Sequence, residues 1–432
     1  MNKPRGAVRW RRLSTSLGAC IVLVLTLSAC AGEDAELNTL EPKGTYARSI
    51  DRLFTPVGYI ALLVLFLVVG AVLYMWFRFR VDDHVEGDWP VQNHGNTKLE
   101  ITWTIVPLII LVIISVPSLA VLQKVNRDAN QDDMTVVVVG QQWWWEFRYY
   151  LGDNAASYDP KVDKLDGKKP DLVTAGQLVI PTGKDVRLVI TSRDVIHSFW
   201  IPALNGKRDA VPGRYQPWKI QADNPGVYFG QCTEFCGLSH SRMRMQAVAL
   251  TPGDYTKWVT DQQAPYVPAS AADQAWLAQQ KEVDATKKQP AAGTAVAEPK
   301  ITLPDGSTTA AGIVTFRSLC TRCHLLRGVN EDIYTAADQV SGAAPELTHF
   351  SSRTTFAGGI FRLYNADGTW NRTALEAWLR NPPAEKDAYA EGKRGMPNLG
   401  LSEEQIEGLV QFLMTTGQVP NKDVTIPATE VE

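Results

Sequence analysis

Two long apolar runs lie near the start of the chain. Residues 57–77 and 101–122 contain no charged side chain, and Arg78, Glu100 and Lys124 stand at their ends. A helix needs about 20 apolar residues to cross the hydrocarbon core of a membrane, and each run has about that length. The pattern therefore predicts a hairpin of two transmembrane helices within residues 30–123.

Beyond residue 134 the pattern changes to short β-branched runs separated by turn residues. Such runs, bounded by Gly, Pro and Asn or Asp, are typical of strands. The runs are residues 134–139, 177–180, 186–191, 218–222 and 246–250. They predict an antiparallel β-sandwich or barrel over residues 124–262, with the polar stretch 152–171 as a surface insertion.

The last third of the chain carries helix signals that follow a stretch of low complexity. Residues 263–311 are rich in Ala, Gln, Lys and Pro, which predicts a flexible linker with one short helix near residues 272–283. An all-α domain is expected over residues 312–420, followed by a tail over residues 421–432. Its helical patterns are residues 312–320, 373–380 and 402–415, the last with a capping-box start.

The N-terminus, residues 1–29, has the pattern of an export signal. Basic residues between Lys3 and Arg12 precede an apolar stretch that is too short to span a bilayer. The segment from Leu27 to Cys30 resembles a bacterial lipobox, which implies cleavage before Cys30 and a lipid on its sulfur; an ordinary signal that ends near a cysteine is the alternative. Export of this end places the chain after about residue 123 outside the cell.

Composition excludes several classes of protein. The chain has 432 residues, of which 45% are hydrophobic, and its 43 basic and 46 acidic side chains give a net charge of −3. A near-neutral balance argues against binding to nucleic acid, and the apolar fraction is too high for a chain that is disordered throughout. Six cysteines are too few for a disulfide scaffold of this length, so each needs its own explanation.

A cluster of soft ligands falls inside the predicted β-rich domain. Cys232, Cys236, His240 and Met243 lie within twelve residues, and His197 stands at the end of a predicted strand upstream. Thiolate and thioether donors together with imidazole select copper, and a weak methionine ligand is typical of electron-transfer copper. Two thiolates four residues apart can bridge two copper ions; a disulfide between them is the alternative.

This run resembles the CuA-binding motif of subunit II of cytochrome c oxidase, and the likeness extends over most of residues 50–250. The resemblance implies a cupredoxin-like antiparallel β-barrel that holds two copper ions. It implies copper binding by His197, Cys232, Cys236, His240, Met243 and the backbone carbonyl of Glu234. In this family the same Glu side chain binds magnesium at the boundary with subunit I, so Glu234 is also a candidate magnesium ligand.

Three further segments share this resemblance. Trp143 matches the family tryptophan that takes electrons from cytochrome c, and plain packing is the alternative for it. Trp144 stands where many members have Tyr. Residues 209–214 match a segment near subunit I, and Glu100 matches a glutamate near a proton uptake path; a charged helix end would also explain Glu100.

A second motif, in the predicted helical domain, indicates haem. Cys320, Cys323 and His324 form a C-x-x-C-H sequence, in which two thioethers attach a c-type haem and the His supplies an axial ligand. A zinc half-site would need a second Cys/His pair, and the remaining cysteines have other assignments.

Residues 312–416 around this motif resemble class I cytochrome c. The resemblance implies Met396 as the second axial ligand, and Met414 and His349 are the alternatives. Ligation by Met and His raises the haem potential, as an electron carrier that feeds copper requires.

The same resemblance assigns residues around the haem. It implies that the carbonyl of Pro345 orients His324 and that Arg353 contacts a haem propionate. Glu346 stands where the family usually has Asn, which makes this loop an unusual one.

The chain as a whole resembles a bacterial cytochrome c oxidase subunit II with a cytochrome c fused at its C-terminus. This resemblance implies that the covalent haem c accepts electrons, that CuA transmits them, and that subunit I reduces oxygen in a proton-pumping complex. The implied partners are subunits I and III and a donor such as a cytochrome bc complex or a small cytochrome c. The implied location is the bacterial plasma membrane, with both domains on its outer face. A flexible linker would let the tethered haem swing between donor and copper at an effective concentration of about millimolar.

Two other functions stay open at this point. A nitric oxide reductase can also contain a CuA subunit, and the partner subunit would distinguish the two. A copper-binding lipoprotein without an oxidase partner would need neither the haem motif nor Trp143. The chain alone is not expected to reduce oxygen, because its only histidines near the apolar runs, His84 and His94, lie in the predicted cytoplasmic loop.

Overall fold

The computed structural model describes residues 35–79, 95–127, 134–165, 167–287, 306–330, 344–389 and 394–417. The predicted export signal with Cys30, the loop with His84 and His94, and the tail 421–432 lie outside these residues.

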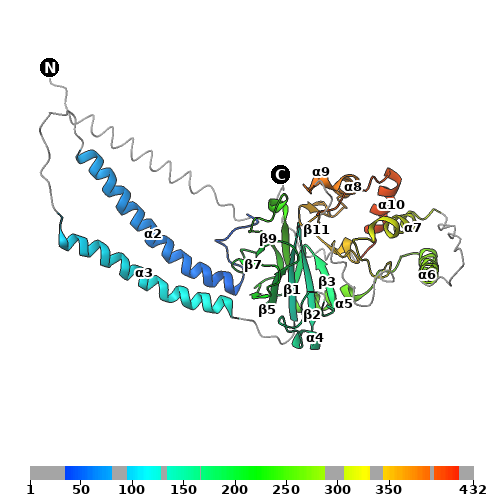
Figure 1. Ribbon diagram of the computed structural model, residues 1–432, viewed down its shortest axis with the longest axis horizontal. Helices are drawn as coiled ribbons and strands as arrows, with labels where there is room; N and C mark the ends of the chain where they lie inside the picture. The colour runs from blue at the N-terminus through cyan, green and yellow to red at the C-terminus, as the bar shows by residue number, and fades with distance from the viewer. Residues whose placement is uncertain are drawn as a thin grey trace, which may run out of the picture.

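The two apolar runs form two long helices, α2 (Thr45–Arg78) and α3 (Thr97–Asn126). Both are long and apolar enough to cross a membrane, and most of their apolar side chains are exposed. They extend together away from the rest of the protein (Figure 1). Asn96 caps α3 by accepting a hydrogen bond from the amide of Leu99. The two predicted spans are confirmed as helices.

The first turns of α2 are bound to the β-rich part of the protein. The amide of Thr45 donates to Oε1 of Gln221 at 2.8 Å, and the amide of Ala47 donates to the carbonyl of Leu204 at 3.1 Å. Tyr46 is buried, and its hydroxyl lies 2.6 Å from a carboxylate oxygen of Asp185. The start of α2 is therefore part of the packed domain that follows.

The β-rich part is a sandwich of two five-stranded sheets (Figure 1). The first sheet has the order β3 (Leu172–Ala175), β2 (Trp144–Leu151), β1 (Met134–Gln141), β5 (Val186–Ser192), β8 (Gln216–Ile220). The second has the order β4 (Gln177–Pro181), β10 (Arg244–Leu250), β9 (Gly226–Cys232), β6 (His197–Trp200), β7 (Arg208–Ala210).

The expected β-sandwich is confirmed, but its sheets are mixed and not antiparallel throughout. β1 pairs with β5 in parallel, and β4 pairs with β10 in parallel, while the other ladders are antiparallel. The chain leaves the first sheet after β3, adds β4 to the second sheet, and returns as β5 beside β1. A strand that returns after crossing to the other sheet can run in the same direction as its neighbour, which a hairpin does not allow.

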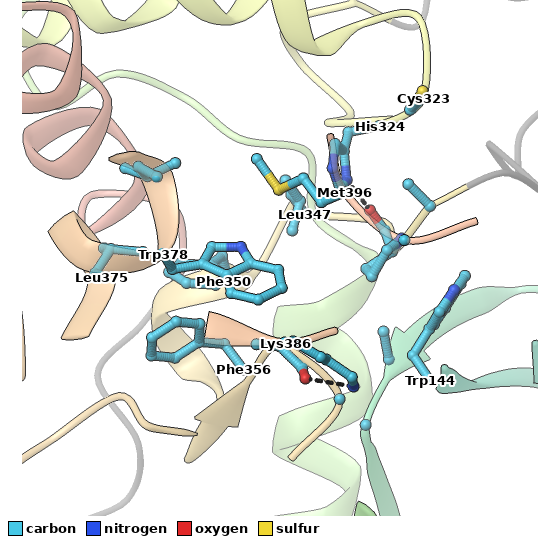
Figure 2. A pocket seen from close by; sticks show the side chains of 18 of the residues that line it. Trp144, Cys323, His324, Leu347, Phe350, Phe356, Leu375, Trp378, Lys386 and Met396 are labelled. Atoms are coloured by element: carbon cyan, nitrogen blue, oxygen red, sulfur yellow. Dashed lines mark hydrogen bonds between the residues drawn. The ribbon is translucent and has the colours of Figure 1, made fainter. Parts of the chain in front are cut away.

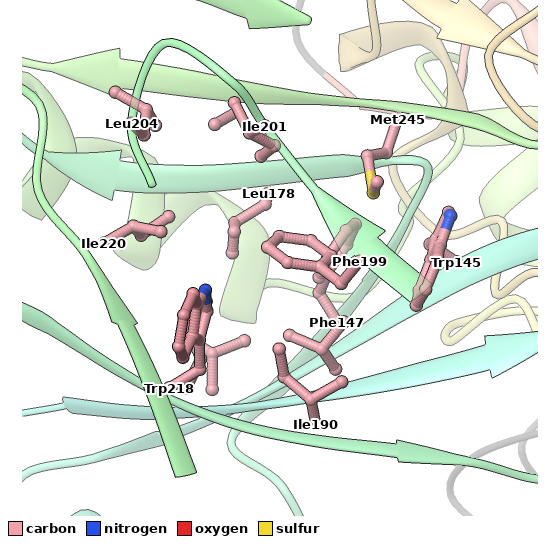
Figure 3. Packing of buried hydrophobic residues seen from close by; sticks show 14 of the residues in the cluster. Trp145, Phe147, Leu178, Ile190, Phe199, Ile201, Leu204, Trp218, Ile220 and Met245 are labelled. Atoms are coloured by element: carbon pink, nitrogen blue, oxygen red, sulfur yellow. The ribbon is translucent and has the colours of Figure 1, made fainter. Parts of the chain in front are cut away.

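Side chains from both sheets fill the core of the sandwich (Figure 3). Trp145 and Phe147 alternate with outward residues on β2, as the two-residue period of a strand requires. They pack against Phe199 of β6, with ring centroids 5.6 and 6.5 Å away. The insertion 152–171 contains the short helix α4 (Asp153–Ala156), and α5 (Pro252–Gln263) covers Tyr149 with Trp258.

The C-terminal unit, which comprises the described residues 266–417, has a separate core. Phe316, Phe350, Leu409 and Phe412 are among its buried members. Its elements are α6 (Ala271–Lys287), α7 (Thr308–Thr315), the π-helical turn Phe316–Cys320, the 3₁₀ turn Phe350–Ser352, β11 (Thr355–Phe356), β12 (Phe361–Arg362), α8 (Arg372–Arg380), α9 (Pro382–Glu385) and α10 (Glu403–Leu413). The capping box at the start of α10 is confirmed, and the unit is not purely helical because β11 and β12 form a small sheet.

The segment 263–311 differs from the predicted flexible linker where the structure describes it. The expected short helix is α6, and its Trp276 and Leu277 are buried in the core of the C-terminal unit. The composition did not reveal this packing, because two apolar residues in a stretch of Ala and Gln give a weak signal. This part of the segment belongs to a folded unit instead of tethering it loosely.

Helices α7 and α10 cross at two glycines. A Cβ on Gly312 would overlap the carbonyl oxygen of Gly408 and come within 2.6 Å of Cβ of Phe412. A Cβ on Gly408 would meet the amide nitrogen of Gly312 at 3.1 Å. The absence of a side chain at Gly312 thus sets how closely the two helices approach.

Candidate functional site

The predicted copper ligands come together at one end of the sandwich. Cys232 is the last residue of β9, and Cys236 follows in the loop that leads to the 3₁₀ turn His240–Arg242. Met243 directly precedes β10. The sequence pattern predicts His197 at the end of a strand. In the structure it is instead the first residue of β6.

The side-chain atoms of these residues lie within 4 Å of a neighbouring member of the group. The sulfurs of Cys232 and Cys236 are 3.8 Å apart. Nδ1 of His197 lies 3.9 Å from the Cys232 sulfur, and Nδ1 of His240 lies 3.6 Å from the Cys236 sulfur. The sulfur of Met243 is 3.9 Å from that of Cys236. Both cysteines are free and buried, so the alternative of a disulfide does not apply to this structure.

The charges around the cluster favour a thiolate and an oriented imidazole. A hydrogen bond from the Cys236 thiol, together with His197, lowers the pKa of Cys232 although burial opposes this shift. Burial lowers the pKa of His197, but Asp194 and Cys232 together outweigh it and raise the pKa overall. Oδ1 of Asp194 lies 2.8 Å from Nε2 of His197, which turns Nδ1 toward the sulfur atoms. This donor set fits copper.

Glu234 presents its backbone and its side chain to different surroundings. Its carbonyl oxygen lies 3.3 Å from the Cys232 sulfur, whereas its side chain is exposed.

The two other segments that resemble the family lie outside the run from Cys232 to Met243. Glu100 lies exposed in the first turn of α3. Residues 209–214 form the end of β7 and the turn after it.

Trp143 is buried beside the copper cluster, which consists of the predicted ligands His197, Cys232, Cys236, His240 and Met243. Its indole Nε1 donates to the carbonyl of Cys236 at 3.1 Å, and only 3% of its surface is exposed. The amide side chain of Gln142 donates to the same carbonyl at 2.7 Å. The ring of Tyr389, from the C-terminal unit, covers the indole at a centroid distance of 5.4 Å.

The haem motif opens into a cavity that the C-terminal unit and the sandwich line together (Figure 2). Apolar side chains of the C-terminal unit, including Phe350, Leu375 and Trp378, line much of its wall. The residues that the sequence assigned to haem and that line the cavity are Cys320, Cys323, His324, Pro345, Arg353 and Met396. An apolar cavity that brings two thiols, an imidazole and a thioether together fits a c-type haem.

His324 has the protonation that an axial ligand needs. Its Nδ1 donates to the carbonyl of Pro345 at 2.7 Å. Burial lowers the pKa of His324, so the imidazole is neutral and its Nε2 carries the lone pair. The side-chain amide of Asn330 donates to the carbonyl of His324 at 3.0 Å, a contact that no motif in the sequence indicates.

The alternatives to Met396 are engaged elsewhere. Met414 packs in the core of the C-terminal unit at the end of α10. Nε2 of His349 lies 3.0 Å from the carbonyl of Gln262 and 2.9 Å from that of Ala264. Arg353 lines the cavity and also donates to the carbonyl of Glu346.

Comparisons with known proteins agree with the geometry of the copper cluster. Residues 134–250 match the family model described as cytochrome c oxidase subunit II, periplasmic domain, and residues 37–121 match that of its transmembrane domain. Cytochrome c oxidase subunit 2 of Alkalihalophilus pseudofirmus is 32% identical over 401 residues, which cover 90% of this chain and 94% of the relative. The chain belongs to the cytochrome c oxidase subunit 2 family.

Other members of the family match a smaller share of the chain. Cytochrome c oxidase subunit 2 of Arabidopsis thaliana is 31% identical over 252 residues, or 56% of this chain and 96% of the relative. A crystal structure of the periplasmic domain of subunit II of the oxidase of Bradyrhizobium japonicum is 26% identical, covers 31% of this chain and 94% of that one, and has a TM-score of 0.25.

Membership in the family settles the coarse function. The protein is subunit II of a haem–copper oxidase, a membrane protein that assembles with subunit I. The family carries a CuA centre, and among the described residues His197, Cys232 and Cys236 form a group that could hold a metal ion.

Proposed function

We propose that this subunit II carries electrons from a respiratory donor to subunit I and holds two redox groups for the purpose. One is a dinuclear CuA centre in the β-sandwich, and the other is a covalent haem c in the C-terminal unit. The donor is a cytochrome bc complex or a small cytochrome c. The complex, with subunits I and III, reduces oxygen and pumps protons across the bacterial plasma membrane, with both groups on its outer face.

The copper pair would be held by His197, Cys232, Cys236, His240, Met243 and the carbonyl of Glu234. Bound copper supplies one-electron chemistry that side chains lack. Asp194 fixes the ring of His197, because its carboxylate lies at Nε2 and leaves Nδ1 directed at the sulfurs. His197, Cys232, Cys236 and Met243 are buried, so water has little access to these ligands.

The haem would be attached through Cys320 and Cys323, with His324 and Met396 as axial ligands. A haem with these ligands supplies an electron carrier of high potential. Pro345 fixes the tautomer of His324 through its carbonyl, and Arg353 brings a positive charge to the cavity wall for a propionate. Apolar side chains around the cavity would keep water away from a bound haem.

The observation that carries the proposal is that both units build the haem cavity. Trp143 and Trp144 of the sandwich line it together with His324 and Met396. Trp143 also bonds to the carbonyl of Cys236, so a single indole touches the cavity and the copper cluster. This position supports a role for Trp143 in electron transfer between the two groups.

Spectra of the assembled oxidase test the proposal. We expect one covalent haem c and two copper ions in this subunit, a delocalised two-copper signal in electron paramagnetic resonance, and a low-spin haem with Met and His ligands. Copper bound as single ions, or a subunit without covalent haem, would refute the assignment.

Glu234 provides a separate test for magnesium. Its side chain is exposed and available to subunit I. With manganese in place of magnesium, we expect the manganese resonance of the oxidase to be lost in Glu234→Gln; an unchanged resonance would remove Glu234 from the site.

A further inference from the structure

The C-terminal unit covers the face of the sandwich where Trp143 lies. Tyr389 stacks obliquely on the indole, with 38° between the ring planes. Gly395 also approaches it, because a Cβ there would come within 3.9 Å of the indole ring. A different part of the same chain thus contributes to the burial of Trp143.

Lys386 crosses the boundary between the two parts. Its ammonium donates to the carbonyl of Trp143 at 2.7 Å and to the carbonyl of Ala357, in its own unit, at 2.8 Å. Only 8% of the residue is exposed, and Figure 2 shows it at the cavity edge. Burial lowers the pKa of Lys386 to about 7, which reflects how much hydration the ammonium loses there. A buried ammonium is costly unless it is hydrogen-bonded, so the two carbonyls are essential to this arrangement.

Gly358 makes room for this contact. A Cβ at this position would overlap the ammonium of Lys386 and come within 2.6 Å of the carbonyl oxygen of Trp143, and its φ of +78° also favours glycine. The carbonyl of Gly358 accepts from the amide of Arg244 at 2.9 Å. Gly358 therefore packs closely against Lys386 of its own unit and against Trp143 and Arg244 of the sandwich.

Further hydrogen bonds surround the copper loop. The hydroxyl of Ser239 donates to the carbonyl of Asp387 at 2.6 Å, and the guanidinium of Arg242 donates to the carbonyl of Glu385. On another side the amide of Thr354 donates to Oε1 of Gln177 at 3.0 Å. The contact is thus specific over a wide surface.

We infer that Lys386 is a positioning residue that clamps the C-terminal unit onto Trp143, so that no diffusing protein can dock on this indole. The inference rests on the proposed relay and names the residue that aligns its two halves. A protein donor consequently has to deliver its electron to the C-terminal unit itself. The tryptophan receives electrons from within the chain.

Accessibility of Trp143 in the assembled oxidase tests the clamp. Hydroxyl-radical labelling followed by mass spectrometry would be measured for the wild type, Lys386→Met, Tyr389→Ala and the control Lys161→Met, which replaces an exposed lysine. The hydrogen bonds that Lys386 donates contribute enough that we expect labelling of Trp143 to rise about tenfold in Lys386→Met. Tyr389→Ala should raise it in the same direction, and Lys161→Met should not change it.

Other tryptophans separate undocking from unfolding. Trp145 and Trp218 are buried in the sandwich, and Trp276 is buried in the C-terminal unit. Their labelling should stay at the wild-type rate. If Lys386→Met also exposes Trp276, the substitution has unfolded the C-terminal unit. Tyr389→Ala, at the rim of the contact, then tests whether the folded unit shields Trp143.

Three results would overturn the inference. One is labelling of wild-type Trp143 as fast as that of Trp370, which is 37% exposed. Another is unchanged labelling in both variants. The third is a rise in labelling while reduced haem still reduces copper at the wild-type rate. Failure of the proposed function is distinct, because it would appear in the wild type as missing haem or copper signals.

Discussion

The crossing of α7 and α10 allows a prediction with a matched control in the same contact. Gly312→Ala places a methyl group against the backbone of Gly408, which has no flexible end that could move aside. Overpacking costs about 1–3 kcal/mol, and a rigid backbone obstacle puts this case at the upper end. The better helix propensity of Ala returns about 1 kcal/mol. We expect a net loss of about 2 kcal/mol in the stability of the C-terminal unit.

Gly408→Ala is the control, because the new methyl group meets its nearest neighbour at 3.1 Å. A shift of a few tenths of an ångström relieves that contact, and the gain in helix propensity offsets the cost. The net change should therefore be close to zero.

Hydrogen exchange in the assembled oxidase measures both variants. Exchange of the amides of α10 through opening of the unit should speed up about 30-fold in Gly312→Ala, since 1.4 kcal/mol corresponds to a factor of ten. In Gly408→Ala it should stay within about threefold of the wild type. Equal effects of the two substitutions, or no effect of Gly312→Ala, would refute the reasoning that Gly312 sets the distance between the helices.

Three further predictions concern the ligands and the response to acid. Met396→Ala should abolish the Met-ligated haem spectrum and lower the haem potential, and Met414→Leu should change neither; a redox titration with spectra compares them. Cys236→Ser should replace the delocalised two-copper resonance by a single-copper signal or none, and an intact signal would exclude Cys236 as a bridge. Burial, with Arg327 nearby, lowers the pKa of His349 to about 4 from 6.5. The unfolded chain therefore binds the extra proton between pH 6.5 and about 4, so stability falls by up to about 3 kcal/mol as the pH drops through this window. His349→Gln should reduce the dependence of the free energy of unfolding on pH in this window. An unchanged slope would show that His349 does not cause the loss of stability.

Much of the fold could be predicted where one pattern dominates a segment. The apolar runs gave both long helices, and the β-branched runs gave β1, β4, β5, β8 and β10 with small errors at their ends. β2 was missed because its inner face is aromatic, with Trp145 and Phe147, and its outer face carries the buried pair Glu146 and Arg148. β6, β7 and β9 were missed because they are short or contain polar and glycine residues.

The site residues could likewise be predicted only where a local sequence pattern marks them. Cys232, Cys236, His240 and Met243 are close in sequence, so their spacing alone indicates a shared metal. Asp194 could have been found, because it stands three residues before His197. Lys386 could not, since its partner is the carbonyl of a residue 243 positions away, and a backbone carbonyl leaves no mark in a sequence.

Because the start of α2 is bound firmly to the sandwich, a change in the tilt of this helix would also turn the sandwich. At 1.5 Å per residue its 34 residues span about 50 Å, and its first turn is fixed through Thr45, Tyr46 and Ala47. Neighbouring helices and interfacial side chains set the tilt of such a helix in the membrane, and a rigid joint passes that tilt on to the attached domain. Because α3 also ends in the sandwich core, through Val125, the height and orientation of the copper cluster above the lipid surface would then follow from the common tilt of α2 and α3.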